Sequence, residues 1–504
     1  MPAFSLEPEH SARCAELRAL AAERLRPIAD RGEPGRVNRP LVAELGRLGL
    51  LARLFTAGAL DLCLLRESLA YACTEAETAL ALQGLGAHPV HAHGTPAQRK
   101  RWLPRVADGS AVAAFALSEP GAGSDAAALT LRAEPVGAGA VASTLRVESV
   151  GTAAVASTLR VEADGTGAVA STSGADQGRT AAVASALWAE AAGTGAGVAS
   201  GGDARGGEVQ GGEVQGGDVQ GGDVRDGGVR DGGAQGGDVR GGGVRGGGTQ
   251  GGGVRDGVSL AAEPDGPSGW RLTGAKCWIS NAPEADFYTV FARTTPGAGA
   301  RGVTAFLVPA DRPGLTGTAL DMLSPHAIGA LDFDAVPVTA DDVLGGIDRG
   351  FRVAMGTLNL FRPSVGAFAV GMAQAALDAT LLHTARRDAF GGKLRDLQTV
   401  AHQVAEMALR TEAARLMVYA AATAYDEGAP DIPRRAAMAK LLATETAQYV
   451  VDTAVQLHGA RALERGHLLE HLYREVRAPR VYEGASEVQR GIIAKELYAN
   501  LEAP

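Results

Sequence analysis

The spacing of apolar residues divides the chain into three stretches of different character. From about residue 10 to 107, apolar positions three and four apart predict helices, as in CAELRALAAERLRPIAD, and PAQRKRWLPRVADG is typical of a capped helix. From Val112, short runs rich in β-branched and aromatic residues, such as VAAFALSE and FYTVFART, predict strands. After Gly350 the helical spacing returns over long segments.

Two long helices are predicted in that last stretch by their apolar faces. One face carries Leu397, Val400, Val404, Met407, Thr411 and Ala414, and the other carries Ala443, Ala447, Val450, Ala454 and His458. Helices, then strands, then helices is the order of an α+β protein with segregated layers. We predict a helical domain over 1–111, a β-domain over 112–340 and a helical domain over 341–504.

Repeats interrupt the predicted β-domain. A 14-residue unit occurs three times between Thr130 and Ser171, and ten glycine-rich pentapeptides fill the segment from Gly206 to Arg255. Glycine loses the most backbone entropy on ordering, and about one valine per pentapeptide buries too little apolar surface to offset that loss. We therefore predict a disordered insertion over about 136–257; an ordered glycine-rich solenoid is the alternative.

Composition and charge narrow the possible partners. The chain has 504 residues, of which 46% are hydrophobic and 21% charged, as is usual for globular proteins. Its net charge of −9 gives no general attraction to nucleic acid or to anionic membranes. The four cysteines show neither metal-ligand spacing nor a CxxC pair, and we find no signal peptide or stretch apolar enough to span a bilayer. We expect a cytoplasmic protein without a metal site.

A possible ligand-binding turn lies in FALSEPGAGSD, from Phe115 to Asp125. Its glycines would let the backbone approach a planar or phosphorylated ligand, and Ser118 and Ser124 offer hydroxyl groups. An ordinary hairpin turn has the same local pattern. In GWRLTGAKCWISNA, Trp278 could stack on a flat ring and Ser280 could bond its polar edge, although a core strand with a buried Trp fits equally.

A candidate general base lies near the C-terminus. Glu483 precedes Gly484 and follows the apolar pair Val481 and Tyr482. Desolvation by such neighbours would raise the pKa of the carboxyl, as a base for carbon acids requires. A surface glutamate at a turn is the alternative interpretation.

Taken together, these segments resemble the acyl-CoA dehydrogenase family. The matching elements follow the family order, namely HGTPAQRKRWLPRVADG, FALSEPGAGSD, GWRLTGAKCWISNA, FRPSVGAFAVGMAQAALDA, RRDAFGGKLRDLQ, AVQLHGA and YEGASEVQR. They cover nearly the whole chain outside the predicted insertion. The resemblance implies an N-terminal all-α domain, a middle β-barrel or sandwich and a C-terminal four-helix bundle.

The resemblance also implies FAD as cofactor and assigns residues to it. FAD-binding positions are Phe115, Leu117, Ser118, Trp278, Ser280, Ala485 and Glu487. Arg387, Phe390, Gln398, Gln456 and Gly459 match positions that bind FAD from a neighbouring subunit, which implies a homodimer or homotetramer. Acyl-CoA contacts are implied for Ser124, Asn359, Arg362 and Gly484.

The reaction implied by the resemblance is α,β-dehydrogenation of an acyl-CoA thioester. Glu483 would remove the α-proton while a β-hydride moves to flavin N5, and electrons would then pass to an electron-transfer flavoprotein. In this family the backbone N–H of the base helps to stabilise the thioester oxygen. Phe361 occupies a position where some members carry their base, which favours Glu483. The alternatives are an acyl-CoA oxidase or acyl-carrier desaturase of the same fold, or a non-catalytic flavin-binding regulatory protein.

Overall fold

The computed structural model describes residues 6–136, 157–161, 168–172 and 269–502. The chain forms two compact units, one comprising residues 1–140 with 265–504 and the other residues 141–264. In the smaller unit, β3 (Ser157–Val161) pairs antiparallel with β4 (Ala168–Thr172). Both strands lie within the predicted insertion. Its remaining residues from 137 onward, including all of the glycine-rich pentapeptides, are outside the described residues.

The N-terminal part of the large unit is helical, as the apolar spacing predicts. It contains α1 (Pro8–Leu20), a π-helical turn (Ala21–Leu25), α2 (Arg26–Ala29), α3 (Arg39–Arg47), a 3-10 turn (Ala52–Phe55), α4 (Ala59–Ala72), α5 (Thr74–His93) and α6 (Pro96–Ala107). α6 begins with a capping box in which the Thr95 hydroxyl accepts from the Gln98 N–H and the Gln98 side chain accepts from the Thr95 N–H. The predicted capped helix is confirmed.

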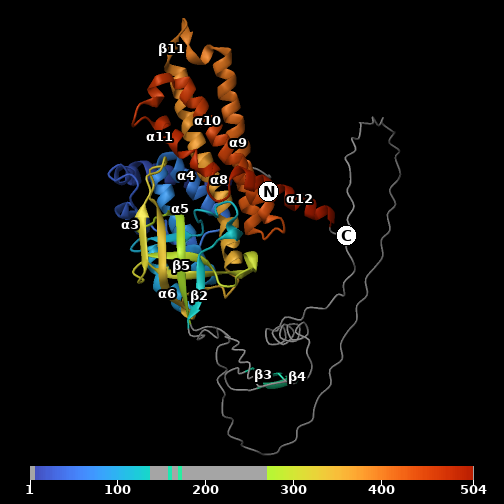
Figure 1. Cartoon of the computed structure of the whole chain (residues 1–504). Helices are drawn as coiled ribbons and strands as arrows, with labels where there is room; N and C mark the ends of the chain where they lie inside the picture. Colours follow the sequence, from blue (N-terminus) through green and yellow to red (C-terminus); the bar gives the residue numbers. More distant parts are fainter. Residues whose placement is uncertain (1–5, 137–156, 162–167, 173–268, 503–504) are drawn as a thin grey trace, which may run out of the picture. The chain divides into compact units, whose positions relative to one another are not determined.

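An eight-stranded sheet follows (Figure 1). Its strands are β1 (Ala113–Ala116), β2 (Arg132–Val136), β5 (Gly269–Ser280), β6 (Phe287–Arg293), β7 (Val303–Pro309), β8 (Leu315–Ala319), β9 (Ile328–Thr339) and β10 (Val343–Leu344). The order is β10-β7-β6-β2-β5-β9-β8, and β1 pairs with β6 in parallel. Val136 lies opposite Gly269 in the antiparallel β2–β5 pair, so residues far apart in sequence are brought together.

The central strand β6 is buried on both faces. Successive side chains of a strand point to opposite sides. Phe287 and Phe291 pack with residues of α5 and α6 and with α8 (Gly350–Arg386), whereas Tyr288 and Val290 pack with residues of β5 and β9. The sheet is therefore covered by helices on the face that carries Phe287 and Phe291.

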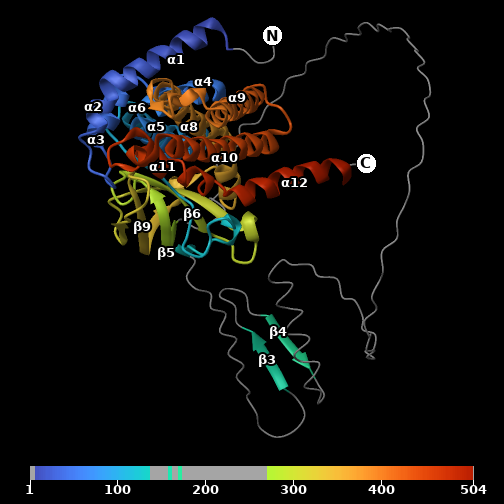
Figure 2. The same ribbon diagram turned by 90° about the horizontal axis from the view of Figure 1, so that it is seen from above.

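The C-terminal part is again helical. After α8 come a short hairpin of β11 (Asp388–Ala389) and β12 (Gly392–Lys393), then α9 (Gln398–Asp426), α10 (Ile432–His458), a 3-10 turn (Gly459–Leu463), α11 (Leu468–Glu475), a 3-10 turn (Ala478–Arg480) and α12 (Ser486–Glu502). The predicted apolar faces of α9 and α10 are buried at Val400, Met407, Thr411, Ala414, Ala443, Ala447, Val450 and Ala454. Figure 2 shows α12 extending away from the other helices. The predicted fold class is confirmed.

One sequence expectation is corrected by α8. By length and composition this helix is apolar enough to cross a membrane, contrary to the expectation that no such stretch exists. In the fold, 72% of its most apolar window is buried. The helix packs against α4, α9 and α10, so its apolar character is accounted for by the protein core.

Candidate active site

Glu483 lies in a tight loop between the 3-10 turn Ala478–Arg480 and α12. Its φ is 52° and that of Gly484 is 95°, so both residues are in the left-handed region. Glycine adopts this conformation readily, but for a glutamate it costs of order 1 kcal/mol and persists only where its surroundings hold it. A Cβ at Gly484 would collide with the side-chain nitrogen of Gln489. Gly484 is therefore required for the close packing of this loop.

Three side chains hold the carbonyl groups of the loop. Arg362 of α8 donates from Nε to the Glu483 oxygen at 3.2 Å. Gln489 of α12 donates from Nε2 to the Glu483 and Gly484 oxygens at 3.0 and 2.9 Å. Lys440 of α10 donates from Nζ to the Gly484 oxygen at 2.8 Å. Since three helices fix the loop, its strained conformation is maintained.

The Glu483 side chain is half-buried, and one of its two carboxyl oxygens is shielded from water. Its Oε2 atom is buried and has no hydrogen-bond partner among the residues that the structure describes. Burial raises the pKa of Glu483, while Arg66, Lys440 and Arg362 act in the opposite direction. The alternative of a surface glutamate at a turn does not fit this environment. A desolvated, incompletely bonded carboxylate is instead suited to taking up a proton.

A buried ion pair lies beside this carboxyl group. Arg66 of α4 donates from Nε to Glu77 of α5 and from Nη1 to the Ser364 hydroxyl at 2.6 Å. Both charged side chains are almost completely buried. Burial raises the pKa of Glu77 to about 7, although Arg66 opposes this shift. This pair and Lys440 were not predicted from the sequence, where each is marked only by a charged residue inside an apolar helical run.

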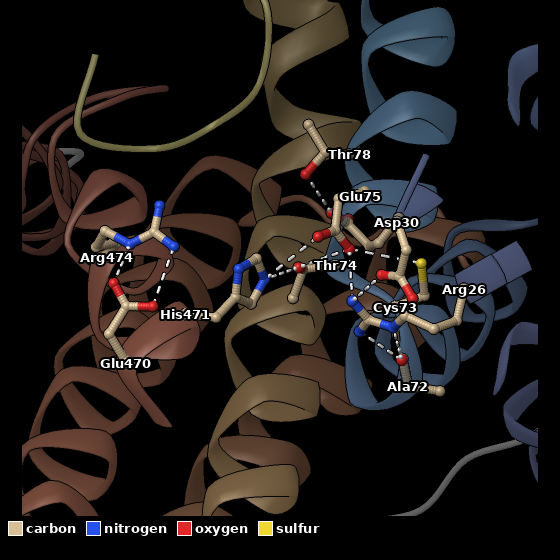
Figure 3. Close-up of polar contacts among 11 residues, drawn as sticks. Arg26, Asp30, Ala72, Cys73, Thr74, Glu75, Thr78, Glu470, His471 and Arg474 are labelled. Atoms are coloured by element: carbon tan, nitrogen blue, oxygen red, sulfur yellow. Dashed lines mark hydrogen bonds and ion pairs between the residues drawn. The ribbon is translucent and has the colours of Figure 1, made fainter. Parts of the chain in front are cut away.

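A second polar network connects the same region to α11 (Figure 3). Glu75 lies 3.1 Å from Nη1 of Arg26, and Nε2 of His471 lies 2.6 Å from the Thr74 hydroxyl and 3.7 Å from Glu75. Near this network, burial and then the charges of Glu75 and Glu77 raise the pKa of Glu475 to about 8. The helices α5 and α11 therefore contain several carboxyl groups whose pKa values differ.

The helices α5 and α8 meet closely next to the Arg362 turn. A Cβ at Gly84 would lie 2.7 Å from Cζ of Phe361, which is 2% exposed. The Phe361 ring centroid is 6.0 Å from that of His88. These aromatic rings fill the space between the two helices. Phe361 directly precedes Arg362, which contacts the Glu483 carbonyl.

A second group of predicted residues lies at the ends of β1 and β5. Lys276, which is fully buried, donates from Nζ to the Leu117 carbonyl and to the Glu119 carboxylate, both at 2.9 Å. The Cys277 N–H donates to the Ser118 carbonyl at 3.0 Å. The structure thus brings Leu117 and Ser118 to the strand that carries Trp278 and Ser280.

A β-bulge sets the direction of Trp278. The register of β5 against β9 shifts between Lys276 and Ile279, and Trp278 has a φ of 57°. Bulges re-aim side chains relative to the regular strand. Trp278 is 47% exposed, so it is not the buried core tryptophan considered above, while Ser280 is half-buried. An exposed indole ring next to hydroxyl groups is available to a flat ligand.

The other residues of the FALSEPGAGSD segment differ in accessibility. The ring of Phe115 packs against Phe291 with centroids 4.8 Å apart, so its side chain faces the protein. Ser124 is exposed in the turn that follows β1. Helix α5 connects this segment to the Glu483 side of the molecule, because Gln83 bonds the backbone of residues 111 and 113 while Gly84 contacts Phe361.

A third group of predicted residues lies at the far end of the helices. The ends of α8 and α10 and the start of α9 meet at one tip of the bundle, where the His383 and His458 rings stack with centroids 4.1 Å apart. The predicted residues at this tip are Arg387, Phe390, Gln398, Gln456 and Gly459. Arg387 is about 37 Å along α8 from Arg362 at 1.5 Å per residue. Figure 1 shows the β11 hairpin at the end of the bundle away from the sheet. Within one chain, these residues do not join the other two groups.

The remaining predicted residues lie close to the base. Asn359 accepts from Nη1 of Arg362 at 3.4 Å, and Gly484 and Ala485 follow Glu483 directly. Glu487 is exposed in the first turn of α12. The structure therefore assembles Asn359, Arg362, Glu483 and Gly484 into one site.

Three family models match successive parts of the chain. They describe the acyl-CoA dehydrogenase N-terminal domain at residues 7–110, the middle domain at 248–336 and the C-terminal domain at 348–498. The chain belongs to the acyl-CoA dehydrogenase family. Together the matches span more than half of the chain and follow the order that the sequence resemblance predicted.

Individual relatives support this membership. The chain is 37% identical over 239 residues to the probable acyl-CoA dehydrogenase FadE25 of Mycobacterium tuberculosis, covering 47% of this chain and 61% of the relative. It is 40% identical over 243 residues to the human mitochondrial short-chain specific acyl-CoA dehydrogenase, covering 48% and 58%. The matched part is thus about three fifths of the length of these relatives.

Solved structures share the fold. Butyryl-CoA dehydrogenase from Megasphaera elsdenii superposes with a TM-score of 0.68 at 23% identity, covering 98% of this chain and 99% of that one. PigA with FAD and proline gives a TM-score of 0.69 at 19% identity, covering 99% of each chain. These likenesses establish the architecture.

Proposed function

We propose that this protein is an FAD-dependent acyl-CoA dehydrogenase in which Glu483 removes the α-proton of the acyl thioester. The observation that carries the proposal is the buried, unpartnered Oε2 of Glu483 in a strained loop held by Arg362, Lys440 and Gln489. Proton abstraction from carbon needs a base whose pKa is raised toward neutrality. Family membership gives the reaction type.

The residues present fit FAD. The exposed indole of Trp278 and the hydroxyls of Ser118 and Ser280 would hold its ring system, while the exposed tip residues would reach the FAD of another copy of the chain. Phe390 is 90% exposed, and a side chain added at Gly459 would meet no other atom within 4 Å of its Cβ, so the space there is open. Bound FAD would supply the acceptor for the β-hydride and its electron pair. The reduced cofactor would be reoxidised by an electron-transfer flavoprotein.

The protein's own residues perform the proton step. Glu483 takes the α-proton, and the C–H electron pair moves into the new Cα=Cβ bond as the β-hydride leaves. The loop conformation fixes the Glu483 N–H, which would donate to the thioester oxygen as that atom gains negative charge. Arg362 and Gln489 hold the loop by its carbonyl groups, so the base and this donor keep a fixed relation.

The acyl group is proposed to be short. Phe361 and His88 fill the space between α5 and α8, and Gly84 allows Phe361 to lie directly against α5. A hydrophobic pocket discriminates by about 10- to 200-fold per methylene. Acyl-CoAs of increasing length should therefore differ in how fast they reduce the flavin, with the shortest fastest.

The test is anaerobic mixing of the yellow protein with a panel of acyl-CoAs, followed by flavin absorbance and by identification of the enoyl-CoA. Bleaching with stoichiometric enoyl-CoA is expected. A yellow protein that no acyl-CoA bleaches would favour the non-catalytic flavin-binding alternative. Rapid reoxidation of the bleached protein by oxygen would instead identify an oxidase.

A further inference from the structure

Lys440 is a buried lysine whose hydrogen bond goes to a neutral group. It is fully buried on α10, and its Nζ donates to the Gly484 carbonyl at 2.8 Å. Removing an ammonium group from water is costly unless the charge is compensated nearby. Burial accordingly lowers the pKa of Lys440 to about 8, and the charge of Glu483 is the first of those that act against this shift.

A charge is not needed to hold this carbonyl. Nε2 of Gln489 donates to the same Gly484 oxygen at 2.9 Å, and Gln489 is also fully buried. The neutral amide therefore performs the same anchoring without the cost of burying an ion. The presence of a lysine beside it points to an electrostatic role.

Of the other two cations around Glu483, one pairs with a carboxylate and one donates, like Lys440, to neutral groups. Arg66 pairs with Glu77, and Arg362 donates to the Glu483 carbonyl and to Asn359. The charged or titratable groups near Glu483 and Lys440 are Arg66 of α4, Glu77 of α5, Arg362 of α8, Glu445 of α10, Glu475 of α11, Tyr482 of the loop and Glu487 of α12. Among them Lys440 combines complete burial with a hydrogen bond to the residue directly after the base.

We propose that Lys440 is a positioning residue for proton abstraction: its buried ammonium anchors the Gly484 carbonyl and keeps the neighbouring Glu483 carboxyl in the ionised form that accepts the proton. The inference rests on the proposed function, because it assigns the base to Glu483. Two side chains bind the Gly484 carbonyl, and we assign a different role to each of them. Gln489 contributes anchoring alone, and Lys440 contributes anchoring together with positive charge.

The test compares two substitutions at this carbonyl group. Lys440→Met removes the charge and one hydrogen bond, whereas Gln489→Leu removes only hydrogen bonds. The rate of flavin reduction at saturating butyryl-CoA is measured by stopped flow against pH. For Lys440→Met we expect the maximal rate to fall. We also expect the acid limb of the pH–rate profile, where the rate rises as the base ionises, to move up by about one pH unit, because losing an opposite charge raises the pKa of a carboxyl. For Gln489→Leu we expect a lower rate with an unmoved acid limb.

A second readout is independent of turnover. The analogue 3-thiabutyryl-CoA has an acidified α-proton, and its bound enolate gives a long-wavelength absorbance with oxidised flavin. The pH at which this band forms should rise in Lys440→Met and stay unchanged in Gln489→Leu. Lys440→Arg, which keeps the charge, should retain the wild-type midpoint and serves if Lys440→Met does not fold. Lys100→Met, an exposed lysine of α6, is the control and should behave as the wild type.

The outcomes separate the two proposals. If the wild-type flavin is reduced and Lys440→Met keeps the wild-type acid limb and enolate midpoint, Lys440 has only an anchoring role and the inference is wrong. If no acyl-CoA reduces the wild-type flavin and the analogue gives no band at any pH, the proposed function itself fails. A shift in Lys440→Met that is equalled by Gln489→Leu would also overturn the inference.

Discussion

Glu119 and Glu483 are glutamates that both lie near a fully buried lysine, but their carboxyl groups have opposite surroundings. Glu119 accepts from the Thr130 N–H and hydroxyl, from the Leu131 N–H and from Lys276. Although burial acts against it, this set of donors holds the pKa of Glu119 below its usual range.

Glu483 lacks such a set of donors. Within the described part of the chain its Oε2 has no hydrogen-bond partner, and the nearby Lys440 donates to a backbone carbonyl instead. Burial consequently raises the pKa of Glu483. The comparison teaches that burial of a carboxylate beside a lysine does not by itself define its role. Because the Glu119 carboxylate is fully hydrogen-bonded, it has a structural role in connecting the segments that follow β1 with β5. Because the Glu483 carboxylate is incompletely hydrogen-bonded, it remains able to accept a proton.

The largest expected effect is on catalysis at Glu483. Glu483→Gln should slow flavin reduction by about 10²- to 10⁴-fold because it removes the general base. FAD content and acyl-CoA affinity should remain, and the free energy of unfolding at neutral pH should not fall, since a desolvated charge is removed. Stopped-flow absorbance, calorimetric titration and urea denaturation measure these quantities. Flavin reduction within tenfold of the wild type would contradict the assignment.

The next effect is on stability at Glu119. Glu119→Gln should lower the free energy of unfolding by about 3–5 kcal/mol because it leaves the Lys276 ammonium buried without its charge partner. The double variant Glu119→Gln with Lys276→Met should recover part of this loss. Urea denaturation of the single and double variants provides the measurement. If Glu119→Gln proves as stable as Glu483→Gln, the contrast between the two glutamates is lost.

A smaller effect should appear in the pH dependence of stability. The pKa of Glu475 is raised by burial to about 8, compared with about 4.3 for an unfolded glutamate. The contribution of Glu475 to stability is thus fully present below its pKa in the unfolded chain, and it is lost as the pH rises toward 8. Glu119, whose pKa is lowered, has the opposite sign and loses its contribution as the pH falls.

Glu475→Gln isolates this behaviour from catalysis. The free energy of unfolding of the wild type should fall more steeply between pH 5 and pH 8 than that of the variant, as measured by urea denaturation at a series of pH values. Parallel profiles for the two proteins would show that Glu475 titrates as it does in the unfolded chain.

The smallest effect is expected from deletion of residues 137–257. The contacts described for the two glutamate sites all come from residues outside this range, and β2 and β5 are paired directly at Val136 and Gly269. Joining Val136 to Val258 leaves enough residues to connect these strands, and a shorter loop is closed at no greater entropic cost. The deletion variant should therefore be yellow, with a midpoint of thermal unfolding close to that of the full chain. Loss of soluble protein would show that the deleted range supports the fold.

The succession of layers and the candidate base were both predictable from the sequence. Apolar spacing is a local property, so it identified the helical and strand regions and the buried faces of α9 and α10. The neighbours of Glu483 within the chain also suggested desolvation. The direction of Trp278 was not predictable, because a bulge in the β5–β9 register leaves no distinct local pattern.

By itself, the sequence determined the order of helical and sheet layers and the family, and it singled out the residue that we propose as base. Only the tertiary structure decided which charges surround that base. Lys440 is 44 positions and Arg362 is 121 positions from the carbonyl groups that they hold. Such contacts depend on how separate helices pack, and the electrostatic effect of a charge depends on distance and burial in space rather than on its place along the chain.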